Sequence, residues 1–182
     1  LKFTSTATDL SACDVIYVAP DVPTDDSGRS DLGPVNALLD SVFAAARKDA
    51  VVILLSQVPP GFTRGWQRPG RSLYYQVETL IFGHAVERAL CPERYIVGCA
   101  DPAQLLPPAY RAFLTAHGCP ILPMRYESAE LAKISINMCL VASVSVANTL
   151  AELCENIGAV WSEIVPALKL DKRIGQYAYL AP

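Results

Sequence analysis

The sequence predicts an α/β protein: the later part of an α/β sheet domain, joined by a long helix to an all-α unit. Short apolar runs closed by turn residues alternate with segments of helical periodicity, the pattern of a layered α/β structure. The apolar runs show no polar alternation, which is typical of parallel strands covered on both faces. A long segment without Pro or Gly then begins near Tyr126.

The predicted strands are four short runs rich in Val, Ile and Leu. Residues 14–19 end at Pro20, and residues 50–55 end at Ser56, just before a Pro-Pro-Gly turn. Two weaker runs of the same kind follow at 94–98 and 120–123. A buried parallel strand has this composition, so we expect about four strands in one sheet.

The predicted helices lie between and after these strands. Residues 32–47 place apolar side chains at close to i, i+3, i+4, i+7 spacing. Looser helical patterns occupy 76–90 and 103–117, a shorter helix is expected at 162–170, and 65–72 is predicted to be an exposed loop.

The most distinctive element is a predicted helix over residues 127–157, which Gly158 should terminate. At 1.5 Å per residue it would be about 46 Å long. Its middle is apolar nearly all round, so we expect a second copy of the chain to cover it. Its charge-free run, 134–150, carries six Ser, Asn and Thr residues, which we interpret as too polar for a bilayer span.

Composition excludes several classes of protein. The 182 residues are 52% apolar and 18% charged, which excludes intrinsic disorder. A net charge of −3 offers no bulk attraction to nucleic acid. We predict no membrane or nucleic-acid partner and a cytoplasmic location. The six cysteines form no CxxC pair, so they are predicted to be reduced, largely buried thiols rather than disulfides or metal ligands.

Several motifs resemble the UDP-glucose/GDP-mannose dehydrogenase family in consistent order from about residue 12 to 180. Val22-Pro23-Thr24 resembles a strand-end turn of that family, and residues 56–63 (SQVPPGFT) are similar to its Ser-Thr-Val-Pro-Pro-Gly-Thr-Thr turn. Residues 75–85 (YQVETLIFGHA) are similar to its Asn-Pro-Glu-Phe-Leu-x-Glu-Gly-x-Ala segment. Residues 127–158 resemble its long dimerisation helix, and 171–175 (DKRIG) the segment after it.

The resemblance implies a function and a domain layout. Residues 1–125 would be the later part of an NAD-binding Rossmann-like domain, and 126–182 a helical dimerisation domain. The family oxidises the C6 alcohol of a UDP- or GDP-sugar to the acid in two steps, using two NAD molecules and a cysteine-bound thioester. The alternative is a non-catalytic relative that keeps the dimer scaffold and perhaps nucleotide binding.

The resemblance also implies that parts of the family's machinery lie outside these residues. The chain starts at Leu1 rather than Met, and we interpret it as a piece of a longer protein, with the family's nucleophilic cysteine expected just after Pro182. The sequence contains no GxGxxG turn to hold a pyrophosphate. We therefore expect these residues alone to bind NAD weakly, if at all, and to lack dehydrogenase activity.

Three residues are candidate catalytic groups by this resemblance. Lys133 and Asn137 would bind an oxyanion, and their spacing puts them one helical turn apart on one face. The alternative is a Glu130–Lys133 surface pair with a solvated Asn137. Glu78 would activate water, or is simply an acid near a helix N-terminus.

Four residues are candidate NAD contacts by the same resemblance: Val22, Pro23, Thr24 and Ser56. They follow predicted strands, where nucleotides bind in open α/β sheets, although the two hydroxyls also suit turn capping. Departures from the family pattern occur at Gln57, Thr79 and Phe82; Gln57 replaces a threonine and Phe82 a glutamate. We therefore expect slow oxidation of the family's usual substrates or an altered substrate or cofactor geometry. Which nucleotide sugar is bound is not set by these residues.

Overall fold

The computed structural model describes residues 3–78, 80, 83–175 and 178. They form two compact units, 1–133 and 134–182, that divide within the long helix α5. In chain order the elements are η1 (Ala7–Ala12), β1 (Val15–Val18), α1 (Gly33–Ala45), β2 (Val51–Leu54), α2 (Phe62–Gly65), β3 (Ser72–Gln76), α3 (Ala85–Leu90), β4 (Tyr95–Cys99), α4 (Pro108–Thr115), β5 (Ile121–Arg125), α5 (Tyr126–Ile157) and α6 (Trp161–Leu170).

The first unit is built on a five-stranded sheet in the order β1-β2-β3-β4-β5. The α/β class and all four predicted strands are confirmed, but the sheet is mixed rather than parallel throughout. Strands β1 to β3 run parallel, β4 is antiparallel to β3, and β5 is parallel to β4. Apolar composition favours a strand, but it carries no information on the direction of the neighbouring strand.

Strand β3 was not predicted. The predicted loop at 65–72 and the predicted helix at 76–90 are partly wrong, because Ser72 to Gln76 form a strand and α3 is limited to Ala85–Leu90. The segment SLYYQ has the aromatic side chains that favour strands, and Leu73, Tyr75 and Gln76 are buried. Pairing on both sides, with β2 and β4, decides its conformation.

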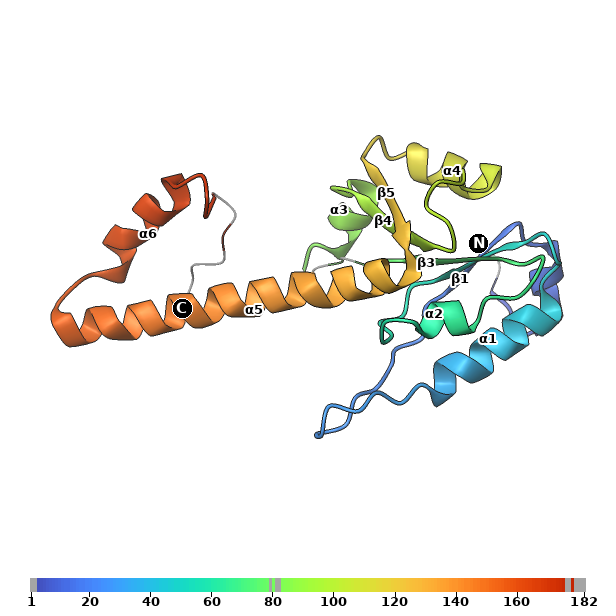
Figure 1. The fold of residues 1–182 in the computed structure, drawn as a ribbon, viewed down its shortest axis with the longest axis horizontal. Helices are drawn as coiled ribbons and strands as arrows, with labels where there is room; N and C mark the ends of the chain where they lie inside the picture. The colour runs from blue at the N-terminus through green and yellow to red at the C-terminus, as the bar shows by residue number, and fades with distance from the viewer. Residues whose placement is uncertain (1–2, 79, 81–82, 176–177, 179–182) are drawn as a thin grey trace. The chain divides into compact units, whose positions relative to one another are not determined.

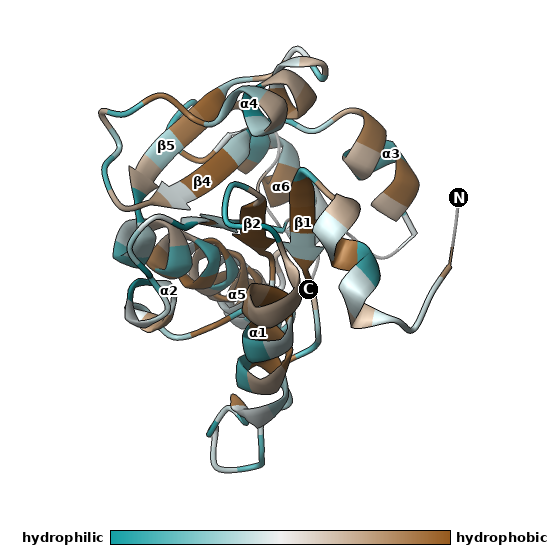
Figure 2. Cartoon of the chain, turned by 90° about the vertical axis from the view of Figure 1, so that its right-hand side faces the viewer, coloured by the Kyte–Doolittle hydropathy of each residue, from teal (hydrophilic) through white to brown (hydrophobic). Residues whose placement is uncertain are grey.

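Helices cover both faces of this sheet, with α1 and α2 on one side and α3 and α4 on the other (Figure 1). On the α4 side, Tyr110 and Leu114 pack in a core cluster with strand residues that include Ile53 and Val97. On the α1 side, Val35, Leu39 and Val42 are buried. Brown, apolar strands lie between the helices in the hydropathy view (Figure 2), as expected for strands covered on both faces.

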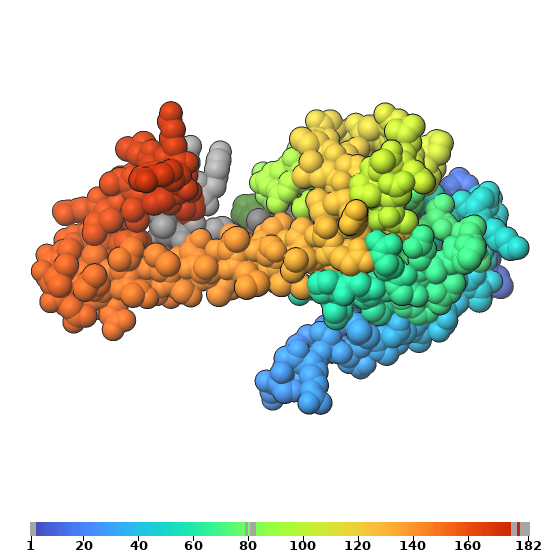
Figure 3. Space-filling model, in the orientation of Figure 1, coloured from blue at the N-terminus to red at the C-terminus, as the bar shows by residue number. Residues whose placement is uncertain are grey.

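The loop from β1 to α1 stands clear of the sheet (Figure 3). Asp25 organises it, because its Oδ1 accepts hydrogen bonds from the backbone N–H groups of Ser27 and Arg29. Thr24 forms an isolated bridge with Ser30. The loop is therefore a short, self-bonded excursion that leads into α1, whose first turn contains Pro34.

The long helix α5 runs from Tyr126 to Ile157, which confirms the predicted helix to within one residue. Gly158 then adopts the left-handed conformation (φ 76°) expected of a helix-terminating glycine. In the second unit, Met138 and Val141 are each 65% exposed. Among the described residues, α5 is the one helix long and apolar enough to cross a membrane by length and composition, so its polar residues do not by themselves exclude a span.

Candidate active site at the start of helix α5

The first two turns of α5 pack tightly on the sheet at Gly98. A Cβ placed on Gly98 would lie 2.9 Å from Cβ of Ala129 and 3.2 Å from the Cα of Tyr126. It would also lie 3.0 Å from Cβ of Tyr75, which pairs with Gly98 across β3 and β4. Only glycine allows this approach, so Gly98 sets how closely the helix meets the sheet.

Tyr126 fastens the helix to β3. Its buried hydroxyl donates a hydrogen bond of 2.6 Å to the backbone carbonyl of Leu73. Burial raises the pKa of Tyr126 well above the ordinary tyrosine value, so the phenol remains protonated and able to donate. The contact fixes the first turn of α5 against the centre of the sheet.

Glu130 fastens the second turn to α2. It is fully buried, and its carboxylate accepts hydrogen bonds from the backbone N–H groups of Gly61 (2.5 Å) and Thr63 (2.8 Å). Sequence reasoning considered Glu130 only as half of a surface pair with Lys133, which is wrong because the side chain is buried. Its negative charge, after burial itself, also raises the pKa of Tyr75.

An exposed ion pair accompanies these buried contacts. Arg64, in α2, forms a two-pronged hydrogen bond and ion pair with Glu127, and its guanidinium lies over the ring of Tyr126. The Arg64 hydrogen bond lowers the pKa of Glu127 to about 2. The carboxylate is therefore ionised throughout the neutral range.

Lys133 connects the helix to the segment after β3. Its Nζ donates a hydrogen bond of 2.6 Å to the backbone carbonyl of Glu78. The Glu78 side chain, half-buried, accepts a hydrogen bond of 3.1 Å from the N–H of Leu80. Two of the three candidate catalytic residues thus meet although 55 positions separate them in the sequence. The third, Asn137, is four residues further along α5 in the second unit, with an exposed side chain.

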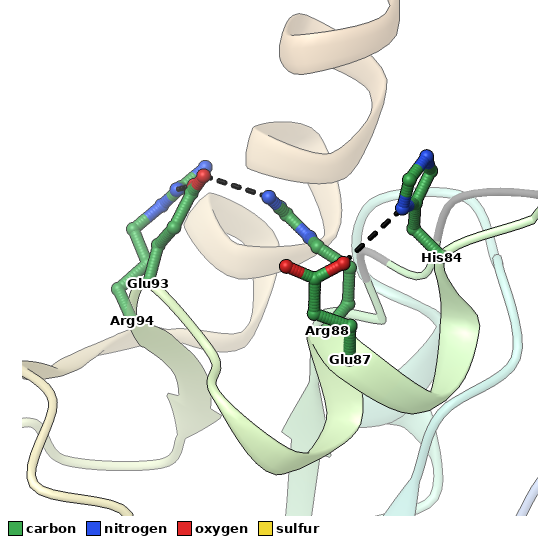
Figure 4. A network of polar contacts seen from close by, with 5 residues as sticks. All are labelled: His84, Glu87, Arg88, Glu93 and Arg94. Carbon is green, nitrogen blue, oxygen red and sulfur yellow. Dashed lines mark hydrogen bonds and ion pairs between the residues drawn. The ribbon is translucent and has the colours of Figure 1, made fainter.

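Glu78 also lines a cavity of about 200 Å³ beside the carboxyl ends of β2 and β3. This edge of an open α/β sheet is where ligands commonly bind. Arg88 and Arg94 belong to the cavity wall and both bond to Glu93, at 2.7 and 2.9 Å (Figure 4). Their hydrogen bonds, Arg88's foremost, lower the pKa of Glu93. Further lining residues include Tyr17, Leu55, Leu80, Tyr95 and Phe113.

The four candidate cofactor residues lie on the loops after β1 and β2. Ser56 is buried two positions after β2, and its hydroxyl donates a hydrogen bond of 2.6 Å to the carbonyl of Pro20, which ties the two loops together. Val22, Pro23 and Thr24 lie further from β1 than a strand-end position implies, since Thr24 is already in the bridge with Ser30. None of the four lines the cavity beside Glu78.

The remaining sequence predictions concern the departures from the family motif and the cysteines. Gln57 is exposed, whereas Thr79 and Phe82 lie outside the described residues. The six cysteines are free thiols, but only Cys99 and Cys154 are buried, so the prediction of largely buried thiols is wrong. In particular Cys139 is exposed on α5. The described residues contain no cluster of three or more His, Cys, Asp or Glu able to hold a metal ion.

Two models of one protein family match most of the chain. Residues 1–112 match the NAD binding domain of the UDP-glucose/GDP-mannose dehydrogenase family, and residues 127–182 match the central domain of the same family. The chain belongs to this family. The resemblance noted in the motifs is thereby confirmed, and an NAD-binding domain accounts for most of the first unit.

Individual relatives cover nearly all of the chain. It is 31% identical to a UDP-glucose 6-dehydrogenase of Rickettsia typhi over 97% of its length, and the match covers 42% of that protein. A UDP-glucose dehydrogenase structure from Pyrobaculum islandicum superposes with a TM-score of 0.81 at 28% identity, covering 96% of this chain and 43% of that one. A GDP-mannose dehydrogenase from Pseudomonas aeruginosa shares the fold, with a TM-score of 0.80 at 19% identity, covering 98% of this chain and 44% of that one. The chain therefore spans about two-fifths of the length of these relatives.

The site residue that sequence reasoning missed is Glu130. The sequence contains one weak indication of its burial: Glu130 follows the apolar Ala129 and lies about one helical turn before the candidate residue Lys133. A carboxylate at such a position is buried only when donors satisfy it, and the donors here are amides of a turn 67 and 69 residues away in sequence. Local pattern does not reveal partners at that distance.

Proposed function

We propose that this chain is part of an NAD-dependent nucleotide-sugar dehydrogenase that oxidises the C6 alcohol of a UDP- or GDP-sugar to the carboxylate in two steps. The observation that carries the proposal is the hydrogen bond from Lys133 to the carbonyl of Glu78, just after the carboxyl end of β3. The overall reaction converts one alcohol, one water and two NAD⁺ into one carboxylate, two NADH and three protons.

In this proposal Lys133 and Asn137 stabilise negative charge on the C6 oxygen. Lys133 holds three N–H donors, and one is used by Glu78, which fixes the direction of the ammonium group. A positioned donor of this kind typically contributes 10²–10³-fold to the rate. Glu78, which lines the cavity, takes a proton from the water that completes the second oxidation.

NAD would supply the hydride acceptor for both steps. The loops after β1 and β2 suit a dinucleotide, because they meet at the carboxyl edge of parallel strands and carry the hydroxyls of Thr24 and Ser56. Ser56 already donates its proton to Pro20, so it would present a hydrogen-bond acceptor to the cofactor. Val22 and Pro23 would contribute apolar contact beside it.

We also infer a cytoplasmic homodimer, with residues 1–125 as the cofactor domain and 126–182 as the dimerisation domain. The support is the exposed apolar surface of α5 in the second unit, where Met138, Val141 and Val146 are 65, 65 and 56% exposed. Apolar side chains in such numbers favour burial against another surface, and a second copy supplies a matching one.

The decisive experiment measures NADH production by the intact protein with UDP-glucose, GDP-mannose and related nucleotide sugars. Lys133→Ala should lower kcat by about 10²–10⁴-fold. Lys48→Ala, which removes an exposed lysine before β2, should leave kcat unchanged. Equal kcat for Lys133→Ala and the unsubstituted protein would refute the catalytic role.

Gln57 favours a second candidate, a non-catalytic relative that binds nucleotide. It stands in the turn after β2 where the family motif has threonine, so a hydroxyl is missing beside the proposed cofactor. Nucleotide-sugar binding by calorimetry without NADH formation, in both the unsubstituted protein and Gln57→Thr, would favour this candidate over the enzyme.

A further inference from the structure

Glu130 is a buried acid whose carboxylate is bonded to two backbone amides. It is fully buried, and an ionised carboxylate is costly to bury unless donors surround it. Its two oxygens each accept one backbone N–H, from Gly61 and from Thr63. Charge-assisted hydrogen bonds of this type are about twice as strong as neutral ones, so the contact is a firm attachment.

The attachment is to the turn that carries Ser56. Residues 56–61 connect β2 to α2, and Gly61 ends the turn with φ 95°, a conformation that other residues rarely adopt. Thr63, in α2 just after the turn, has a buried hydroxyl oxygen, Oγ1, with no hydrogen-bond partner in the described part of the chain. The Glu130 carboxylate therefore holds the junction between the turn and α2 through the backbone of Gly61 and Thr63.

On α5 itself, Glu130 precedes Lys133 by about one helical turn, so both side chains lie on similar faces of a rigid element. Lys133 reaches the carbonyl of Glu78, while Glu130 reaches Gly61 and Thr63. One helix segment is thus bonded to the segments that follow β2 and β3. A shift of this segment would move both the turn and the lysine.

We propose that Glu130 is a positioning residue that sets the turn at 56–61 and Lys133 in a fixed relation to each other. The proposal rests on the function given above, in which this turn contacts the cofactor and Lys133 contacts the substrate. Glu130 acts through these two groups, so its loss should affect the turn and the lysine together rather than the fold as a whole.

The test compares Glu130→Gln with Tyr126→Phe in the intact protein. Glutamine is close in size, but it has one acceptor oxygen and turns an NH₂ donor toward one of the two amides. Tyr126→Phe deletes another buried hydrogen bond of the same helix, one that goes to β3 rather than to the turn. The two variants therefore separate loss of the turn contact from general loosening of α5.

Two readouts do not require activity: hydrogen exchange of the amides in 56–65, and the rate at which an amine-reactive acetylating reagent labels Lys133. For Glu130→Gln we expect amide exchange to be at least 10-fold faster and Lys133 labelling several-fold faster. For Tyr126→Phe both should remain within 2-fold of the unsubstituted protein. If Glu130→Gln cannot be purified, Glu130→Asp, which is too short to hold both amides, must show the same two changes.

The proposal is overturned if either readout is unchanged in the Glu130 variant, or if Tyr126→Phe changes both to the same extent. A kinetic arm follows with NAD and a nucleotide sugar: Glu130→Gln should lower kcat at least 10-fold, whereas Tyr126→Phe should lower melting temperature without lowering kcat. An unsubstituted protein that makes no NADH would refute the proposed function, while the exchange and labelling results would still decide whether Glu130 links the turn to Lys133.

Discussion

The two parts of helix α5 differ in what surrounds them. In its first two turns, Tyr126, Ala129 and Glu130 are at most 2% exposed, and sheet or turn residues satisfy their polar groups. After Lys133, large apolar side chains such as Met138 and Val141 are mostly exposed. The helix is continuous, so its backbone conformation does not depend on how it is covered.

The difference in exposure indicates that the two parts of α5 are stabilised by different contacts. At the start of α5, small and polar side chains let the helix approach Gly98 closely and bond to neighbouring segments. In the second unit, the apolar side chains have surface left for a partner, and burying each Leu-sized one contributes about 1.5–3 kcal/mol. Packing within the chain fixes the first part, and association is predicted to fix the second.

The largest effect is expected on dimer dissociation, when charged side chains are placed on the exposed part of α5 after Lys133. The double substitution Met138→Glu and Val141→Glu should raise the dimer dissociation constant at least ~100-fold, because it removes about 3 kcal/mol of apolar burial. Sedimentation over a range of concentrations measures this. Leu105→Glu, on an 80% exposed side chain of the first unit, serves as control and should leave the dimer intact. An unsubstituted protein that sediments as a monomer at all concentrations would contradict the prediction that the exposed part of α5 mediates association.

A smaller effect is expected at the close approach of α5 to β4. Gly98→Ala adds a methyl group 2.9 Å from the Cβ of Ala129 and 3.2 Å from the backbone of Tyr126. Overpacking of this kind typically costs about 1–3 kcal/mol, so we expect the free energy of unfolding to fall by about this amount. Urea titrations measure the change. Gly65→Ala, where the added Cβ meets nothing within 4 Å, should cost nothing. Equal losses in both variants would show that the approach is not tight.

The smallest effect is expected from the exposed pair of Arg64 and Glu127. The folded pKa of Glu127 is lowered to about 2, from an ordinary value of 4.5. A lowered acid pKa stabilises the fold at pH above the unfolded value, and this contribution is lost as pH falls from about 4.5 to about 2. Because both side chains are about 40% exposed, the gain is about 0.2–1 kcal/mol.

Glu127→Gln and Arg64→Met should each remove that part of the acid dependence of the unfolding free energy. Urea titrations at intervals between pH 2 and 7 measure it. If the acid dependence in both variants matched that of the unsubstituted protein, the pair would contribute nothing to stability.

Much of the architecture could be read from the sequence, because the deciding information is local. The absence of Gly and Pro from 127 to 157, and Gly158 after it, determined α5 almost to the residue. Continuous apolar runs located β1, β2, β4 and β5, although only β2 and β4 are buried along their whole length. Motif order indicated the family and gave Glu78 and Lys133 candidate roles, although their contact cannot be predicted from local sequence.

Tertiary structure decided what depends on residues far apart in the chain. Strand β3 forms because β2 and β4 pair with SLYYQ, and β4 is antiparallel to it; neither fact is encoded in local periodicity. Glu130 has the charge of a surface residue, but amides more than 60 positions away make its burial favourable. Cys139 lies in an apolar stretch and is nevertheless exposed. The sequence by itself determined which segments are helical or apolar, whereas long-range hydrogen bonds and packing decided which side chains those segments bury, because burial is a property of neighbours rather than of composition.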